Sequence, residues 1–449
     1  MTVLALLGVV LLVAGAAGLV LLEVLLKRAD VAAAMLFATI LVQALFVDKV
    51  PALQLPGETR LYVTDLVAAS IMVAALARVL RLKRFDRFQR WLLLLGVVLG
   101  VSLLRGAAAF GIHSAVNDVR QYLFFFGATL YFSTFAPLPG LSARIGRIWL
   151  VMTVPMMLLA GLRWLQNFAG LHLGIPAAKW GADAAIRVLD GPYVFFLSQA
   201  FVLTIPAWLR GQQSRWQRVL SVVLLLMVIA LNRRTAWLAV LVGIAVVMLR
   251  DRRLGRRALT LVVLGGALAV VGFVAVGGLQ EGVEQPVTQE DTGNLTWRVQ
   301  GWSELVGGWV HNPVSWVLGE PFGSSFAREI DGSKVTSHPH DFYIETMMRA
   351  GIPGLIALLV LTVGVMRALW RTPTPAPGLL DVGIMPALLA MQVVWYVTWI
   401  PGSEQGIVTG LALAMAAMPL AGRRPGLMPP PAHELAGPFT LPADRNGRS

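Results

Sequence analysis

Long apolar segments alternate with short polar ones along most of the chain. Many of them approach or reach the roughly 20 residues that a helix needs to cross the hydrocarbon core of a bilayer. The first segment has no basic residue before it and no small-residue cleavage site after it, so we expect a retained helix and not a signal peptide. The pattern predicts membrane-spanning helices at residues 3–26, 31–47, 61–80, 91–110, 116–136, 146–168, 192–209, 216–232, 234–250, 259–278, 343–366, 380–400 and 403–421.

The composition agrees with this prediction. Hydrophobic residues make up 57% and charged residues 14% of the 449 residues, and the mean hydropathy is +0.72. A soluble domain carries about 25% charged residues. We therefore expect an all-α, polytopic integral membrane protein with about 12–13 transmembrane helices and one large periplasmic loop. The absence of cysteine excludes disulfides, thiolate zinc sites and cysteine nucleophiles.

The basic residues gather in short clusters between the apolar segments. Because Lys and Arg are concentrated on the cytoplasmic side of membrane proteins, these clusters predict the topology, with the N-terminus outside and the C-terminus inside. The net charge of +13 therefore gives no reason to expect nucleic-acid binding. The clusters span residues 27–28, 78–90, 144–147, 210–218, 250–257, 367–371 and 423–424.

Four regions follow from this topology. Residues 1–278 would form ten transmembrane helices with short loops, and residues 342–421 three more. Residues 279–341 would form a large periplasmic loop with amphipathic helices, because Leu295, Trp302, Val306 and Trp309 recur at helical spacing. The Pro-rich segment 422–449 is expected to be a disordered cytoplasmic tail.

Two histidines, His338 and His340, lie at the end of this loop, and the chain has only six. Imidazole can accept a proton near neutral pH, so either could act as a general base. Equally, both could be polar interfacial residues at the start of the next helix. Asp341 follows at a position where a carboxylate favours a helix N-terminus.

His340 begins a recognisable spacing. His340 and Asp341 are followed, after nine residues, by Gly351-Ile-Pro-Gly354, and this resembles the H-[NSQ]-x9-G-x-x-[GTY] signature of the O-antigen ligases and the related O-antigen polymerases. Asp341 departs from the signature, which has Asn, Ser or Gln there. The Gly and Pro residues have a sufficient structural role in kinking a helix beside His340.

Several arginines extend the resemblance. Leu231-Asn-Arg-Arg-Thr-Ala236 is similar to a short Ser-Arg-Thr/Gly turn of the family, with Arg234 at the arginine and Arg233 beside it. Trp297-Arg298 is similar to an arginine–aromatic pair in the large loop, and Arg187 is a weaker match. Guanidinium groups bind phosphate oxygens bidentately. Each arginine could instead be a snorkelling residue at a helix end.

The resemblance implies a metal-independent, inverting glycosyltransferase without a cofactor in the bacterial inner membrane, with its active site facing the periplasm. The donor would be a glycan on undecaprenyl pyrophosphate, and the acceptor a hydroxyl of lipid A-core or of another glycan. His340, Arg234 and Arg298 would be catalytic. Arg233, Arg187, His338 and Asp341 would contact the pyrophosphate or the acceptor.

Other functions stay open. An O-antigen or exopolysaccharide polymerase, or a protein O-oligosaccharyltransferase, would share these features, but a single dominant loop favours a ligase. A transporter of lipid-linked glycans would need more charged residues deep in its helices. A metal-dependent transferase would need clustered outer carboxylates, whereas Asp48, Glu58, Asp183 and Asp190 are scattered.

Overall fold

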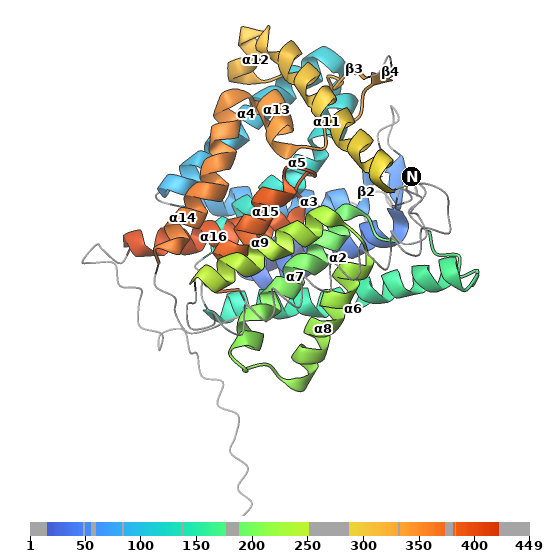
Figure 1. Cartoon of the computed structure of the whole chain (residues 1–449). Helices are drawn as coiled ribbons and strands as arrows, with labels where there is room; N and C mark the ends of the chain where they lie inside the picture. The colour runs from blue at the N-terminus through green and yellow to red at the C-terminus, as the bar shows by residue number, and fades with distance from the viewer. Residues whose placement is uncertain are drawn as a thin grey trace, which may run out of the picture.

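The computed structural model describes residues 16–47, 50–54, 60–82, 85–135, 139–176, 188–250, 287–330, 333–372, 380–381 and 383–421. Nearly all regular structure in these residues is helical, and six of the described helices are long and apolar enough to cross a membrane. The expected all-α, polytopic membrane architecture is therefore confirmed (Figure 1). The predicted span 259–278 and the predicted tail 422–449 lie outside the described residues, as does the beginning of the span 3–26.

The helices follow the predicted spans closely. They are α2 (Ala29–Phe46), α3 (Val63–Arg81), α4 (Arg87–Phe110), α5 (Ile112–Ser133), α6 (Pro139–Phe168), α7 (Gly191–Leu209), α8 (Arg215–Ala230), α9 (Arg234–Arg250), α13 (Phe342–Leu359), α14 (Val365–Trp370), α15 (Met385–Trp395) and α16 (Ser403–Ala421). Residues 16–27 are helical as well. A π-helical segment, Val360–Gly364, joins α13 to α14.

One predicted span is too long. Residues 380–400 contain only α15, whose 11 residues rise about 16 Å, well short of the roughly 30 Å of hydrocarbon. The residues from Met385 to Gln392 are all buried inside the protein. The helix ends in a turn with Pro401 and Gly402 beyond it. A helix packed on all sides is as apolar as one that faces lipid, which is why the sequence pattern overestimated its length.

The helix ends fall into two sets. At one end of the bundle, Arg78 donates to the Leu26 carbonyl and to Thr134, and Arg250 donates to the Leu369 and Thr372 carbonyls. The ends of α3, α5, α9 and α14 therefore meet residues from the side on which the basic clusters are predicted. The opposite ends also meet, since the buried Arg163 donates to the Ala44 and Val188 carbonyls at 2.6 and 2.9 Å.

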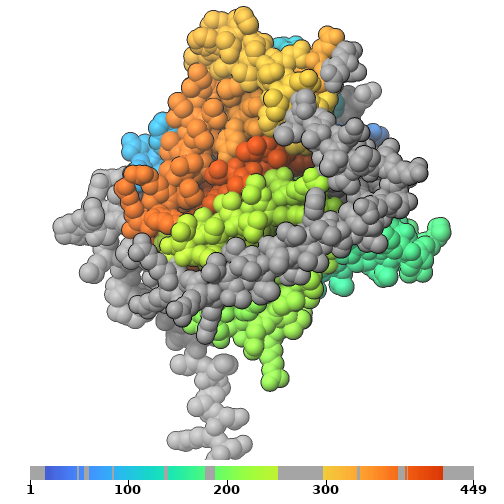
Figure 2. Space-filling view, in the orientation of Figure 1, coloured from blue at the N-terminus to red at the C-terminus, as the bar shows by residue number. Residues whose placement is uncertain are grey.

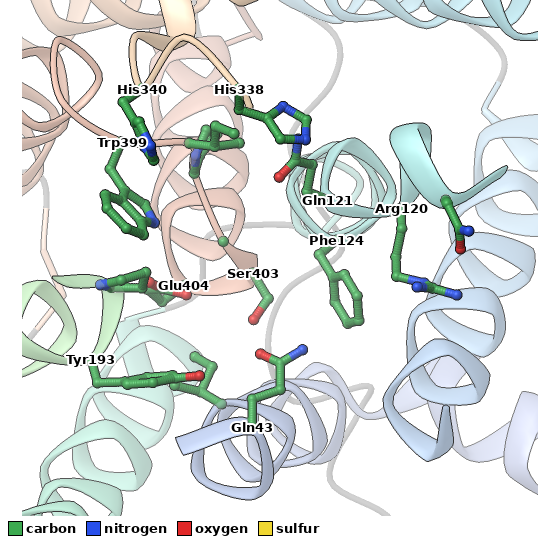
Figure 3. A pocket seen from close by; sticks show the side chains of 16 residues that line it. Gln43, Arg120, Gln121, Phe124, Tyr193, His338, His340, Trp399, Ser403 and Glu404 are labelled. Atoms are coloured by element: carbon green, nitrogen blue, oxygen red, sulfur yellow. The ribbon is translucent and has the colours of Figure 1, made fainter. Parts of the chain in front are cut away.

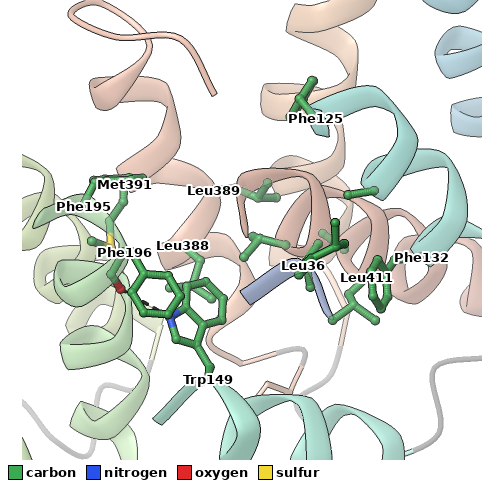
Figure 4. Close-up of a cluster of buried hydrophobic side chains, with 14 of the residues drawn as sticks. Leu36, Phe125, Phe132, Trp149, Phe195, Phe196, Leu388, Leu389, Met391 and Leu411 are labelled. Atoms are coloured by element: carbon green, nitrogen blue, oxygen red, sulfur yellow. Dashed lines mark hydrogen bonds between the residues drawn. The ribbon is translucent and has the colours of Figure 1, made fainter. Parts of the chain in front are cut away.

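Aromatic side chains fill the interior between these two ends. Trp149 stacks on Phe196 with ring centroids 5.5 Å apart (Figure 4). The ring of Phe37 packs 5.1 Å from the same indole. The indole N–H donates to the Phe196 carbonyl at 3.3 Å, so this buried polar group is satisfied. This cluster ties α2, α6 and α7 together.

The loop segments form a layer at one end of the bundle (Figures 1 and 2). This layer contains α11 (Val287–Val310), α12 (Pro313–Leu318) and the hairpin of β3 (Arg328–Ile330) with β4 (Ser333–Val335). A second hairpin pairs β1 (Ala52–Gln54) with β2 (Arg60–Tyr62). Of the expected apolar stripe of α11, Trp309 packs on protein, because it is buried with its neighbour Leu305 against Phe326 and Met348.

A break in α13 lets this layer approach the bundle closely. Gly351 has φ +63° and ψ −169°, and its α-carbon faces the Trp316 and Val317 carbonyls at the end of α12. The break frees the Met348 carbonyl, which accepts a hydrogen bond from the Glu320 N–H at 2.5 Å. The expected kink is thus present, but the helix breaks at Gly351, two residues before Pro353.

Replacing Gly351 by alanine should destabilise the protein by roughly 1–3 kcal/mol. A Cβ atom there would strain the left-handed backbone and lie 2.6–2.9 Å from backbone atoms that cannot swing away. Thermal unfolding in detergent measures the effect. Gly100→Ala is the matched control, because its Cβ would meet open space in α4 and should raise stability slightly. Equal midpoint shifts in the two variants would contradict this account of the break.

Candidate functional site

A pocket of about 410 Å³ lies between the loop layer and the bundle (Figure 3). Its residues come from the helix ends opposite the arginine-rich ends. They are Ile40 and Gln43 of α2, Asn117, Arg120, Gln121 and Phe124 of α5, Pro192 and Tyr193 of α7, His338 and His340 of the loop, and the segment 399–404 around the start of α16. The pocket thus brings together residues more than 300 positions apart in the chain.

The backbone around His340 is fixed on both sides. The Trp302 indole of α11 donates to the Pro339 carbonyl at 2.7 Å, and Asp341 caps α13 by accepting from the Ile344 N–H at 2.9 Å. Between these anchors His340 adopts a positive φ of 52°, a conformation that few non-glycine residues take and that is often associated with functional sites. Its ring lies against Trp399, with centroids 5.4 Å apart, at the pocket wall.

The surroundings of His340 favour its neutral form. Burial lowers the pKa of His340 to about 4, and the positive charges of Arg298, His338 and Arg328 add to this effect. A neutral imidazole can accept a proton, whereas an imidazolium cannot. His340 is therefore in the protonation state that a general base requires, at any pH well above 4.

Arg298 lies close enough to His340 for its charge to act on that ring. It is half-buried on α11, and burial lowers the pKa of its guanidinium. A partly desolvated guanidinium interacts more strongly with phosphate oxygens than one in water. The docking of α11 through Trp302 thus brings together two of the predicted site residues.

His338 occupies a different environment, between two carboxylates. Its Nδ1 atom lies 3.3 Å from Glu345 Oε2 of α13, and its Nε2 atom lies 3.9 Å from Asp118 Oδ1 of α5. Burial disfavours the charged ring, but Glu345 and Asp118 outweigh burial and the nearby Arg349, so the pKa of His338 is raised. Both ring nitrogens face protein groups, and His338 connects the loop to two helices.

Arg349 completes this cluster. Its side chain is buried and donates to Asp118 Oδ2 at 2.6 Å and to the Pro321 and Ser324 carbonyls at 2.9 and 2.7 Å. The Gly323 N–H donates to the same Asp118 oxygen at 3.0 Å. Arg349 and Asp118 therefore hold the turn after α12 against the bundle.

Of the remaining predicted arginines, neither Arg233 nor Arg234 lines the pocket. Arg233 is 3.5 Å from Asp190, the residue that caps α7 just before Pro192 and Tyr193 of the pocket. Arg234 is exposed at the start of α9 and is not among the residues that line the pocket. Arg187 lies outside the described residues. The roles of all three stay predictions.

Some pocket residues were not found from the sequence. Arg120 of α5 is paired with Asp65 at 3.0 Å and donates to the Arg60 carbonyl. Charged residues in an otherwise apolar helix often mark function, so Asp118 and Arg120 carried a usable signal. Tyr193, Trp399 and Glu404 carried none, because aromatic and acidic residues are common at helix ends. Among the described residues, no group of three His, Asp or Glu could hold a metal ion.

Glu345→Gln should reveal the ion pair of His338 through the pH dependence of stability. A raised histidine pKa contributes stability that is present at low pH and is lost as the pH rises through that pKa. The variant should therefore be less stable than wild type by roughly 1–3 kcal/mol at pH 6, and the difference should shrink by pH 9. Thermal unfolding at both pH values measures this. The exposed Glu329→Gln is the control, and a difference independent of pH would refute the pairing.

Comparison with known proteins adds one match. A model of the O-antigen ligase family matches residues 219–359, whereas no curated protein and no solved structure matches the chain. The matched segment runs from within α8 to the end of α13 and includes Arg298, His338 and His340. It supports placing this membrane protein in the O-antigen ligase and polymerase superfamily.

Proposed function

We propose that the chain is an O-antigen ligase-type glycosyltransferase. It transfers a glycan from undecaprenyl pyrophosphate to an acceptor hydroxyl of lipid A-core at the periplasmic face of the inner membrane. The family match supports a membrane enzyme acting on lipid-linked glycans. The observation that carries the proposal is a neutral His340 in the pocket wall, with the charge of Arg298 close by.

The reaction follows from these two residues. Neutral His340 accepts the proton of the acceptor hydroxyl as its oxygen attacks the anomeric carbon of the donor. The bond between that carbon and the pyrophosphate oxygen breaks, and undecaprenyl pyrophosphate leaves with the electron pair. Attack from the face opposite the leaving group inverts the anomeric centre. Arg298, with Arg234, would neutralise the leaving pyrophosphate, and Arg233 and Arg187 would contact the pyrophosphate or the acceptor, so the proposal needs neither metal nor cofactor.

The location of the pocket supports a periplasmic site. Its walls are helix ends opposite those with the arginine clusters, which the positive-inside rule places in the cytoplasm. A donor with a membrane-embedded polyprenyl chain could present its pyrophosphate at this level, near the interface.

The acceptor distinguishes a ligase from a polymerase. The single dominant loop, residues 279–341, favours the ligase. Expression in a ligase-deficient strain tests this, because a ligase restores lipopolysaccharide capped with O-antigen on a gel. Lengthened lipid-linked glycans without capped lipopolysaccharide would identify a polymerase instead, and glycosylated protein an O-oligosaccharyltransferase.

His340→Ala should lower the transfer rate about 10²–10⁴-fold, the usual contribution of a general base. Arg298→Ala should also lower it, and Arg298→Lys should lower it less because the charge remains while bidentate binding is lost. Transfer from a lipid-linked donor in detergent is the assay, repeated with excess EDTA. His311→Ala is the control, an exposed histidine of the same loop layer. Near-normal turnover of His340→Ala and Arg298→Ala would overturn the assignment.

The pH dependence of kcat should reflect the low pKa of His340. Because the pKa of His340 is lowered to about 4, the rate should stay level down to about pH 5 and fall only as the imidazole becomes protonated. Arg298→Gln removes a positive charge that lowers this pKa, so its acid limb should move to higher pH even where the rate is reduced. A wild-type acid limb near pH 6.5 would show that the base is not His340 in this environment.

A further inference from the structure

The pocket differs in charge on the two sides of His340. On the side of the loop layer, the positive charges of Arg298 and Arg328 act on the ring. The opposite wall consists of Gln43, Tyr193, Trp399, Ser403 and Glu404, which we call the lower wall. Among the described residues that line the pocket, Arg120 is the only Lys or Arg, and its guanidinium is paired with Asp65 at 3.0 Å. The lower wall is thus unsuited to a pyrophosphate.

Glu404 makes this wall still less suitable for an anion. Its side chain lines the pocket near the start of α16, yet the residue is only 2% exposed. None of the ion pairs between described residues includes Glu404. Burying a charged carboxylate without a cation is costly, and in either protonation state Glu404 offers no positive charge to a phosphate. It does, however, accept hydrogen bonds from hydroxyl groups. An uncharged ligand rich in hydroxyls therefore fits Glu404.

Two aromatic rings flank this carboxylate. Trp399 lies above Glu404 and Tyr193 below it, as Figure 3 shows, and both side chains are half-buried. The centroid of the Trp399 ring lies 5.4 Å from that of His340 and 6.4 Å from that of Trp395, and both contacts are tilted. An aromatic face offers apolar contact to C–H groups, and the neighbouring Gln43 and Ser403 can donate and accept hydrogen bonds. Rigid aromatic surface beside a few convergent polar groups is typical of a small-ligand site.

We propose that the lower wall binds an uncharged sugar ring, with its C–H face on Trp399 and its hydroxyls bonded to Glu404, Tyr193 and Gln43. This proposal rests on the proposed function and places the pyrophosphate on the opposite, cationic side of His340. The sugar ring belongs either to the donor glycan or to the acceptor. The lower wall, which lies entirely outside the segment matched by the family model, then determines which glycan reacts.

Glu404→Gln, Tyr193→Phe and Trp399→Ala test the lower wall in the full-length protein in detergent. The measurements are KM for a lipid-linked glycan donor, KM for the acceptor, and the inhibition constant of inorganic pyrophosphate. Each variant should raise KM for one of the two glycan substrates by about tenfold, the effect of losing about 1.4 kcal/mol of binding. The substrate affected identifies the source of the sugar. The inhibition constant of pyrophosphate should not change.

Trp216→Ala is the control, because Trp216 is an exposed aromatic residue at the arginine-rich end of α8. If Trp399→Ala does not fold, the KM values of the nearly isosteric variants Glu404→Gln and Tyr193→Phe test the proposal. Unchanged KM values in the variants, with a wild-type enzyme that transfers glycan, would overturn this proposal alone. Weaker inhibition by pyrophosphate in parallel with KM would also overturn it, by assigning the wall to the anion. A wild-type protein without transfer activity would contradict the proposed function and this proposal with it.

Discussion

The buried ion pair between Arg349 and Asp118 is the contact on which the geometry of the site depends. At 2.6 Å it joins α13 to α5, and the remaining guanidinium donors hold the carbonyls of the turn after α12. Leaving either charge unpaired in this buried position would cost considerable free energy, so the two side chains stay together. The pair therefore fixes the position of the loop layer on the helix bundle. His338, 3.9 Å from the same carboxylate, transmits this constraint to the segment that carries His340.

The pKa values of two imidazoles separated by one residue are shifted in opposite directions because their neighbours differ. His338 lies between carboxylates and its pKa is raised, whereas His340 is buried beside cations and its pKa is lowered to about 4. Opposed environments of this kind assign different roles to chemically identical groups. In the proposed reaction His340 accepts the proton, and His338 keeps the loop end in place through its contacts with the two carboxylates.

The sequence predicted the helices well because crossing a bilayer imposes both length and apolarity, and the span 234–250 coincides with α9. It failed at α15, since a helix buried among other helices has the same composition as one in lipid. The spacing of the histidine signature led to His340, and a weaker motif led to Arg298. No local pattern could reveal that Glu404, Trp399 and Tyr193 line the same pocket as His340, because their proximity arises from the packing of the whole helix bundle. The sequence also could not show that Arg234 would lie exposed at a helix start.

The pocket joins residues inside the segment matched by the family model with residues outside it. His338 and His340 lie within this matched segment, residues 219–359, whereas the facing residues of α2, α5, α7 and α16 lie outside it. If both proposals hold, the residues that catalyse the transfer and the residues that bind the sugar lie in different parts of the sequence. Substitutions outside the matched segment can then alter which glycan is accepted without changing the catalytic residues inside it. Such an enzyme could change its glycan specificity during evolution, as the cell-surface polysaccharide changes, while the catalysed reaction stays the same.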